Sequence, residues 1–249
     1  MIICPNCGGD AKELSNGECV CSFCGNHFSL ARKVDPVINY NQTMTQELSG
    51  EEIYDMNINS VLEIHNLSFS CSGSGVIIDK SGLALTNAHV VMNEDKVATN
   101  LQVYNCNTKK TYKARVLATG KKNMKSTDGI DLALILIENY HEEYCSKIGD
   151  STKVKNGAKV YYIGNSLGEG TAITSGIISD NNRIMSGTKH RYFMADAATN
   201  PGNSGCPLYN NQGELIAIHV SARNSAVGMK FSIPIEYALS FIDAFNKVR

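Results

Sequence analysis

The sequence predicts an all-β protein with a small cysteine-rich module in front and a helix at the end. Short apolar, β-branched runs alternate with Gly-, Asn- and Lys-rich turns from about residue 61 onward, which is typical of a barrel or sandwich. The last such run is followed by Pro234–Asn246, where the apolar residues recur with a helical period. The predicted strands are Val61–Ile64, Gly75–Ile78, Leu83–Leu85, Lys96–Val97, Leu101–Tyr104, Ala114–Leu117, Asp131–Ile137, Ala158–Ile163, Thr171–Thr174, Gly176–Ile178, Leu215–Ile218 and Lys230–Ile233.

Length and composition are those of an ordinary globular protein. The 249 residues fit one large domain or two unequal ones, with 43% hydrophobic and 19% charged residues. A net charge of −1 gives no general attraction to nucleic acid or to anionic lipid. No apolar run reaches the roughly eighteen residues that a membrane helix needs, so we expect no membrane association.

The cysteines and the first residues predict a cytoplasmic location. Met1-Ile-Ile-Cys-Pro lacks the basic start and long apolar core of a secretory signal. Of the nine cysteines, four form two Cys-x-x-Cys pairs, which favours reduced thiols and a metal over disulfides.

Residues 1–30 are predicted to form a module around one structural zinc ion. Cys4-Pro-Asn-Cys7-Gly and Cys21-Ser-Phe-Cys24-Gly each turn two thiolates toward one centre, and the glycine permits the tight turn. So short a segment buries too little apolar surface to fold alone, so metal binding would supply its folding free energy.

Alternatives to this ligand set remain open. A redox pair is one, and Cys19 or His27 are competing zinc ligands. The module resembles the zinc ribbons found on many bacterial and archaeal proteins. With only Lys12 as a basic residue within the knuckles, it favours docking to a protein over nucleic acid.

Residues 31–50 are polar, lack a sustained period and are predicted to be a linker. Glu51 to about Asn59 is predicted to be a short helix, with Ser49 as its cap.

The loop Asp196–Leu208 is the candidate nucleophile loop. Ser204 lies between Asn203 and Gly205, with Gly202 one step further back. Glycines allow a positive φ and close approach to a ligand, so the loop can expose the hydroxyl. It can also aim the amides of Gly202 and Ser204 at one point, where the oxyanion of a tetrahedral intermediate would lie.

A candidate base and acid precede this loop in the chain. His89 follows a predicted strand, and Asp131 begins the most apolar one, where a half-buried carboxylate can hold an imidazole. Considered alone, His89 is equally consistent with a histidine packed in the core, and Asp131 with a residue that terminates a strand. Asp128, in a loop beside Gly129, is the fallback acid.

Four segments together resemble the chymotrypsin-fold serine proteases, most closely the HtrA (Deg) and bacterial glutamyl endopeptidase branches. They are Ser72-Gly-Ser-Gly-Val-Ile-Ile-Asp79, Leu85-Thr-Asn-Ala-His-Val-Val91, Asp131-Leu-Ala-Leu-Ile135 and Ala197-Ala-Thr-Asn-Pro-Gly-Asn-Ser-Gly205.

The resemblance spans roughly residues 51–240 and implies a trypsin-like protease domain over 51–249, built of two six-stranded antiparallel barrels. His89 and Asp131 would stand on the first barrel and Ser204 on the second. By this resemblance Ser204 is the nucleophile, His89 the base and Asp131 its orienting acid. The amides of Gly202 and Ser204 would form the oxyanion hole. Cys206 stands where the family usually has Gly, and we expect a packed thiol there.

The specificity pocket departs from the trypsin pattern. Ala198 is expected at the pocket base, where enzymes that prefer Lys or Arg carry an Asp. Glutamyl endopeptidases resemble this chain in pairing a His beyond the nucleophile with a hydroxyl before it, here His219 and Thr199. Both groups can donate to a carboxylate or amide oxygen, which predicts cleavage after Glu, with Gln second. The alternative is that His219 only fills the barrel wall.

Two functions follow from these residues. The first is a serine endopeptidase that acts on protein or peptide substrates, with the zinc ribbon serving for partner docking or regulation. The second is a catalytically inactive protease-fold scaffold, or a binding module that acts through the ribbon. Ser204, His89 and Asp131 all occur within their local motifs, which favours the first.

Overall fold

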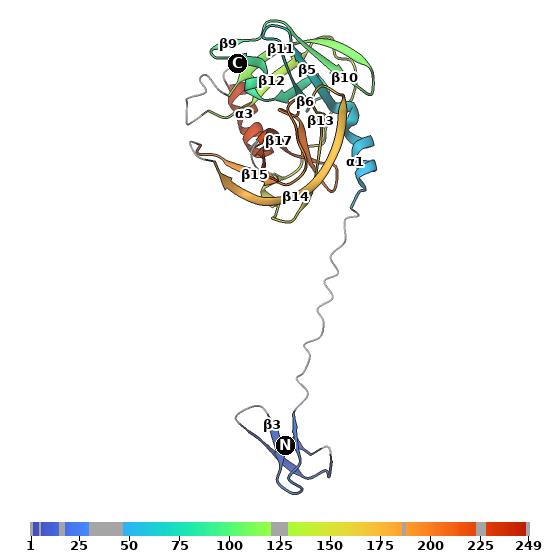
Figure 1. The fold of residues 1–249 in the computed structure, drawn as a ribbon, viewed down its shortest axis with the longest axis vertical. Coiled ribbons are helices and arrows are strands. Elements are labelled where there is room, and N and C mark those ends of the chain that lie inside the picture. Colours follow the sequence, from blue (N-terminus) through green and yellow to red (C-terminus); the bar gives the residue numbers. More distant parts are fainter. Residues whose placement is uncertain are drawn as a thin grey trace. The chain divides into compact units, whose positions relative to one another are not determined.

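The structure, a computed structural model, describes residues 2–4, 6–14, 18–29, 47–120, 129–185, 188–222 and 228–247. Its contacts divide the chain into two compact units, Met1–Thr45 and Gln46–Arg249 (Figure 1). Most of the predicted linker 31–50, and the fallback acid Asp128, lie outside the described residues.

The first unit is a small antiparallel sheet. Its strands are paired in chain order: β1 (Ile2–Ile3), β2 (Asp10–Glu13), β3 (Glu18–Cys21) and β4 (His27–Ser29). The turn glycines Gly8 and Gly25 have φ of 72° and 71°, the left-handed region that glycine adopts without a Cβ clash. The sheet therefore brings the two Cys-x-x-Cys turns to one end.

The second unit consists of two closed six-stranded antiparallel barrels, which confirms the predicted fold class (Figure 1). The first barrel contains β5 (Val61–Asn66), β6 (Cys71–Ile77), β7 (Leu83–Thr86), β10 (Leu101–Asn105), β11 (Lys110–Thr119) and β12 (Ala133–Ile137). The second contains β13 (Lys159–Asn165), β14 (Thr171–Ile184), β15 (Arg191–Ala195), β16 (Pro207–Asn210), β17 (Leu215–Ala222) and β18 (Lys230–Pro234).

Short elements connect these strands. The helix α2 (Ala88–Val91) and the hairpin β8 (Met92–Asn93) and β9 (Lys96–Val97) lie between β7 and β10. Two 3-10 turns occupy Ile58–Ser60 and Ser151–Lys153.

Two helices flank the barrels where the sequence predicts them. The helix α1 (Gly50–Asn57) begins with Ser49, whose hydroxyl accepts from the Glu52 amide while the Glu52 carboxylate accepts from the Ser49 amide. This capping box satisfies backbone donors that the first turn leaves free. The helix α3 (Ile235–Lys247) closes the described chain, with Ile235 and Ala238 buried. No helix in the described ranges is long and apolar enough to cross a membrane.

The strand predictions differ from the structure around Gly176 and after residue 190. The predicted runs 171–174 and 176–178 form one fourteen-residue strand, β14. Gly176 marks a close approach and not a turn, because a Cβ there would lie 2.3 Å from Asp196 Oδ1. The strands β15 and β16 were not predicted, since the first starts at a charged arginine and the second at a proline.

The barrels share a core as well as each having its own. One buried cluster contains Val76, Leu85 and Leu134 of the first barrel together with Tyr161 and Ile218 of the second. Two further clusters fill the separate barrel interiors. The shared cluster holds the barrels together, so residues at their seam have a defined relative position.

Candidate active site

His89 and Asp131 contact each other beside this seam. His89 lies on α2 and Asp131 two residues before β12. One carboxylate oxygen of Asp131 lies 2.8 Å from His89 Nδ1, and the other accepts the His89 amide at 3.0 Å. The Asn87 side chain also donates to the Asp131 carbonyl at 2.9 Å. Asp131 is only 9% exposed and hydrogen-bonds both the ring and the backbone amide of His89. It therefore fixes the orientation of the His89 ring and favours a proton on Nδ1. That tautomer leaves Nε2 free to accept a proton.

The loop that carries Ser204 depends on two glycines with positive φ. Gly202 has φ 95° and Gly205 has φ 87°. A Cβ would lie 2.3 Å from the Asn165 carbonyl at Gly202 and 2.2 Å from the Ser74 carbonyl at Gly205. Only glycine combines this conformation with such close packing. The predicted role of these glycines in shaping the loop agrees with their geometry.

The Ser204 loop packs against the segment that carries His89. A Cβ on Gly205 would lie 3.2 Å from the Asn87 amide, and one on Gly73 would contact both Val90 and the Ser204 carbonyl. The Ser74 amide donates to the Ser204 carbonyl at 2.8 Å. Gly205 therefore lies beside Asn87, and both Val90 and the Ser204 carbonyl border Gly73. The described hydrogen bonds include none between Ser204 Oγ and His89. Such bonds are often long before substrate binds.

Ser74 was not predicted as a site residue, yet it ties the two barrels together. Its hydroxyl donates to the Gly202 carbonyl at 2.8 Å and accepts the Asn165 amide at 3.0 Å. It lies in the Ser72-Gly-Ser-Gly motif, and its small side chain gave no signal of this bridging role.

The amides of Gly202 and Ser204 have no hydrogen-bond acceptor in the described part of the chain. Their neighbours do: the Asn203 amide donates to the Asn200 carbonyl, and the Gly205 amide to the His219 carbonyl. Two unpaired amides separated by one residue can bind an anionic oxygen from outside the protein.

Thr199 and His219 are buried, and each has a polar atom without a partner. Thr199 is 5% exposed and His219 3%, and neither Thr199 Oγ1 nor His219 Nδ1 has a hydrogen-bond partner among the described residues. His219 is linked to the nucleophile loop, because its amide donates to the Cys206 carbonyl at 2.9 Å. Buried polar groups normally have hydrogen-bond partners. Two buried polar atoms without such partners, next to the nucleophile loop, therefore indicate a ligand site.

Ala198 is exposed, whereas Thr199 and His219 are buried, and its carbonyl accepts the Thr174 hydroxyl at 2.7 Å. Its place at the pocket base stays a prediction. Cys206 is fully buried, and burial raises the pKa of its thiol, so it is packed as the sequence predicts.

Burial keeps the His219 ring neutral. Desolvation, followed by the charges of Lys230 and His89, lowers the pKa of His219 to about 3, while a hydrogen bond with the Phe231 backbone acts in the opposite direction. The ring also packs edge-on against Tyr162, with centroids 5.1 Å apart. At neutral pH the imidazole is therefore a polar group without charge.

A second cluster of chemically active side chains lies in the first unit. The sulfurs of Cys4, Cys7, Cys21 and Cys24 all lie within 4.8 Å of one another. Four thiolates at tetrahedral zinc, with bonds of about 2.3 Å, require sulfurs roughly 3.8 Å apart. The Cys4–Cys24 and Cys7–Cys21 separations are 3.8 and 3.5 Å.

The surroundings of Cys21 favour a thiolate. The amides of Cys24 and Phe23 donate to Cys21 Sγ, each at 3.4 Å, and lower its pKa to about 6. Cys19 is buried outside the cluster, and His27 is exposed. The donor set thus fits zinc without either alternative ligand.

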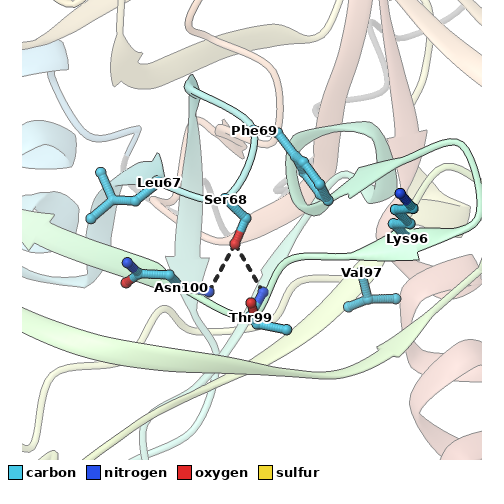
Figure 2. A pocket seen from close by; sticks show the side chains of 7 residues that line it. All are labelled: Leu67, Ser68, Phe69, Lys96, Val97, Thr99 and Asn100. Atoms are coloured by element: carbon cyan, nitrogen blue, oxygen red, sulfur yellow. Dashed lines mark hydrogen bonds between the residues drawn. The ribbon is translucent and has the colours of Figure 1, made fainter.

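A surface pocket of about 640 Å³ lies beside the hairpin that follows α2 (Figure 2). The Ser68 hydroxyl forms part of its wall and accepts the amides of Thr99 and Asn100, at 3.0 and 2.9 Å. Its lining contains none of the three predicted catalytic residues, so it is not the catalytic centre.

Two six-stranded barrels, with an imidazole–carboxylate pair facing a glycine-shaped serine loop at their seam, define a peptidase domain of the two-barrel serine type. A family model described as "Trypsin-like peptidase domain" matches residues 73–218, more than half of the chain. The chain belongs to the trypsin-like peptidase family.

Named relatives come from the HtrA/Deg side of this family. The chain is 36% identical over 172 residues to "Putative serine protease HhoA" of Synechocystis sp., covering 67% of this chain and 41% of the relative. It is 35% identical over 178 residues to "Probable periplasmic serine endoprotease DegP-like" of Marinomonas sp., covering 70% and 35%. Among solved structures, "HtrA-type protease AlgW with tripeptide" aligns with a TM-score of 0.68 at 28% identity, covering 79% and 63%. The chain thus spans less than half the length of these two curated relatives.

These names contradict the predicted cytoplasmic location. Several relatives are named periplasmic serine proteases, so that prediction is wrong on this comparison. It rested on the first residues and on free thiols. Free thiols do not determine the compartment, because a bound metal can hold thiolates.

Proposed function

We propose that this protein is a serine endopeptidase of the HtrA/Deg type. Ser204 is the nucleophile, His89 the general base and then acid, and Asp131 the residue that orients His89 and stabilises its protonated form. The observation that carries this proposal is that Asp131 hydrogen-bonds both the ring and the amide of His89, directly beside the Ser204 loop.

The chemistry follows from this placement. Ser204 Oγ attacks the scissile carbonyl while His89 Nε2 takes its proton, and the negative oxygen is held by the amides of Gly202 and Ser204. His89 then gives the proton to the leaving amine, which leaves an acyl group on Ser204. Water hydrolyses this acyl-enzyme by the reverse sequence of proton transfers.

A fluorophosphonate probe tests this assignment. We expect stoichiometric labelling of Ser204 in the intact chain and no labelling of Ser204→Ala, because the probe reacts only with an activated serine. Ser179→Ala, at an exposed position on β14, serves as the matched control and should label like the unchanged protein. A folded protein that is never labelled would instead support the inactive scaffold.

We also propose that the enzyme cleaves after glutamate, with glutamine second. Thr199 offers a buried hydroxyl and His219 a buried imidazole next to the nucleophile loop, and Thr199 Oγ1 and His219 Nδ1 have no partner among the described residues. An apolar substrate side chain would leave both unsatisfied, whereas a carboxylate or amide oxygen can accept from them. Ala198 offers no carboxylate, so a Lys or Arg side chain would enter without a partner.

Peptides that differ only at the residue before the scissile bond measure this preference. We expect kcat/KM for Glu and Gln peptides to exceed that for Val and Arg peptides by about tenfold or more, since each buried group left unpaired costs about 1–3 kcal/mol. Thr199→Val should reduce this advantage without abolishing hydrolysis of the Val peptide. Equal rates for Val and Glu would refute the proposed pocket.

For the first unit we propose one structural zinc ion held by Cys4, Cys7, Cys21 and Cys24. The donor set and sulfur separations support this, and a closed thiolate site leaves no position for substrate. We further propose that this zinc ribbon docks the peptidase to a protein partner or regulates it.

A further inference from the structure

Lys230 lies on the same face of the second barrel as His219. In the β17–β18 pair His219 is directly opposite Ser232, and opposed residues of antiparallel strands point to the same side. Lys230 is two residues from Ser232, so the strand alternation puts it on that side too. The predicted strand Lys230–Ile233 begins with this residue, but no pattern in the sequence indicates a role for it in the pocket.

The Lys230 side chain reaches the other buried pocket residue. Its Nζ donates to the Thr199 carbonyl at 3.2 Å. This contact holds the ammonium beside Thr199, and its charge acts on the His219 ring. Thr199 Oγ1 and His219 Nδ1 are the two buried atoms of these residues without a partner among the described residues.

No carboxylate in the described part of the chain forms an ion pair with Lys230. The nearest acidic residue along the neighbouring strand is Asp196, which follows the Lys230 partner Ala195. Asp196 Oδ1 instead accepts the Ile177 amide at 2.7 Å. The ammonium at this pocket therefore has no counter-ion among the described residues, although a half-buried charge favours one.

We propose that Lys230 is the residue that makes this pocket select an acidic side chain, glutamate or aspartate, over glutamine. This inference rests on the proposed peptidase function and deepens its specificity. A substrate carboxylate would accept from Lys230 Nζ, from Thr199 Oγ1 and from the His219 ring. A glutamine amide would form the neutral hydrogen bonds but would lack the charge-assisted one.

Among the described residues, the charged and titratable groups around His219 are Lys230, His89 and the phenol of Tyr162. His219 itself stays uncharged down to about pH 3, so it contributes a donor and no charge at neutral pH. His89 is paired with Asp131.

Matched Glu and Gln peptides, tested on the full chain and on Lys230 variants, decide the question. We expect a Glu-to-Gln ratio of kcat/KM of about tenfold or more in the unchanged protein. Lys230→Met should lower that ratio about tenfold by slowing the Glu peptide, with the Gln peptide changed less than about threefold. Lys230→Arg should keep the ratio, and the control Lys155→Met, an exposed lysine on the same barrel, should not alter it.

Folding is checked independently with the fluorophosphonate, whose reaction with Ser204 does not use the pocket. Should Lys230→Met fail to label, Lys230→Gln replaces it, because glutamine keeps a donor for the Thr199 carbonyl and lacks the charge.

The outcomes separate this inference from the proposed function. An unchanged ratio in a labelled Lys230→Met or Lys230→Gln protein overturns the role of Lys230 and leaves the peptidase standing. Failure of the unchanged protein to label or to cleave any peptide overturns the peptidase, and the role of Lys230 with it.

Discussion

Asp131→Asn is expected to lower kcat/KM about 10⁴-fold without unfolding the protein. The His89 amide needs an acceptor at one end of the Asp131 side chain, so an asparagine there would keep its carbonyl oxygen at that end. Its NH₂ group would then face His89 Nδ1 and donate to it. The imidazole would carry its proton on Nε2, where it cannot accept the proton of Ser204.

Steady-state hydrolysis of a Glu peptide measures this effect, and urea unfolding shows that the fold is retained. The matched control is Asp243→Asn, a carboxylate exposed on α3, which should leave kcat/KM unchanged. Activity within about tenfold of the unchanged protein would mean that Asp131 does not orient the base.

Removing zinc is expected to unfold the first unit completely and leave the barrels folded. The four-stranded sheet is short, and structural zinc contributes about 10–16 kcal/mol of apparent binding free energy in comparable modules. A chelator should therefore abolish the amide protection of residues 2–29, while the amides of the barrel strands stay protected.

Elemental analysis should find one zinc per chain, and Cys21→Ser should lose it. Cys19→Ser is the matched control, because Cys19 is buried outside the four-sulfur cluster, and it should keep the metal. Full metal content in Cys21→Ser, or protection of residues 2–29 in chelator, would contradict the site. Short-peptide hydrolysis in chelator separates the two proposed roles, since docking leaves it unchanged and regulation alters it.

Much of the architecture could be predicted because it depends on local patterns. Alternating β-branched runs, the Ser49 cap and the terminal apolar period each describe a segment by its own residues, and the barrels, α1 and α3 agree with them. The two Cys-x-x-Cys knuckles are likewise local. Where local rules failed, a distant contact explains it, as at Gly176, which makes room for Asp196 inside β14.

Only those residues of the candidate site that stand in a recognisable sequence motif could be predicted. His89, Asp131 and Ser204 stand in recognisable segments, so their roles could be proposed before their positions were known. The Ser74 hydroxyl hydrogen-bonds with Asn165 and Gly202, which lie 91 and 128 positions further along the chain. No spacing in the sequence reveals this contact. Lys230 was missed for the same reason, because its importance comes from the strand opposite and from a loop thirty-one residues earlier.

By itself the sequence determined the fold class, the cysteine cluster and which residue types were available for catalysis, since these follow from periodicity and short-range spacing. Tertiary structure alone decided that Asp131 hydrogen-bonds both the ring and the amide of His89, that His219 is buried without charge, and that the ammonium of Lys230 reaches Thr199 in the same pocket. The physical reason is that desolvation and hydrogen-bond geometry depend on which distant strands close the barrel, and a linear pattern of residues does not encode the resulting distances.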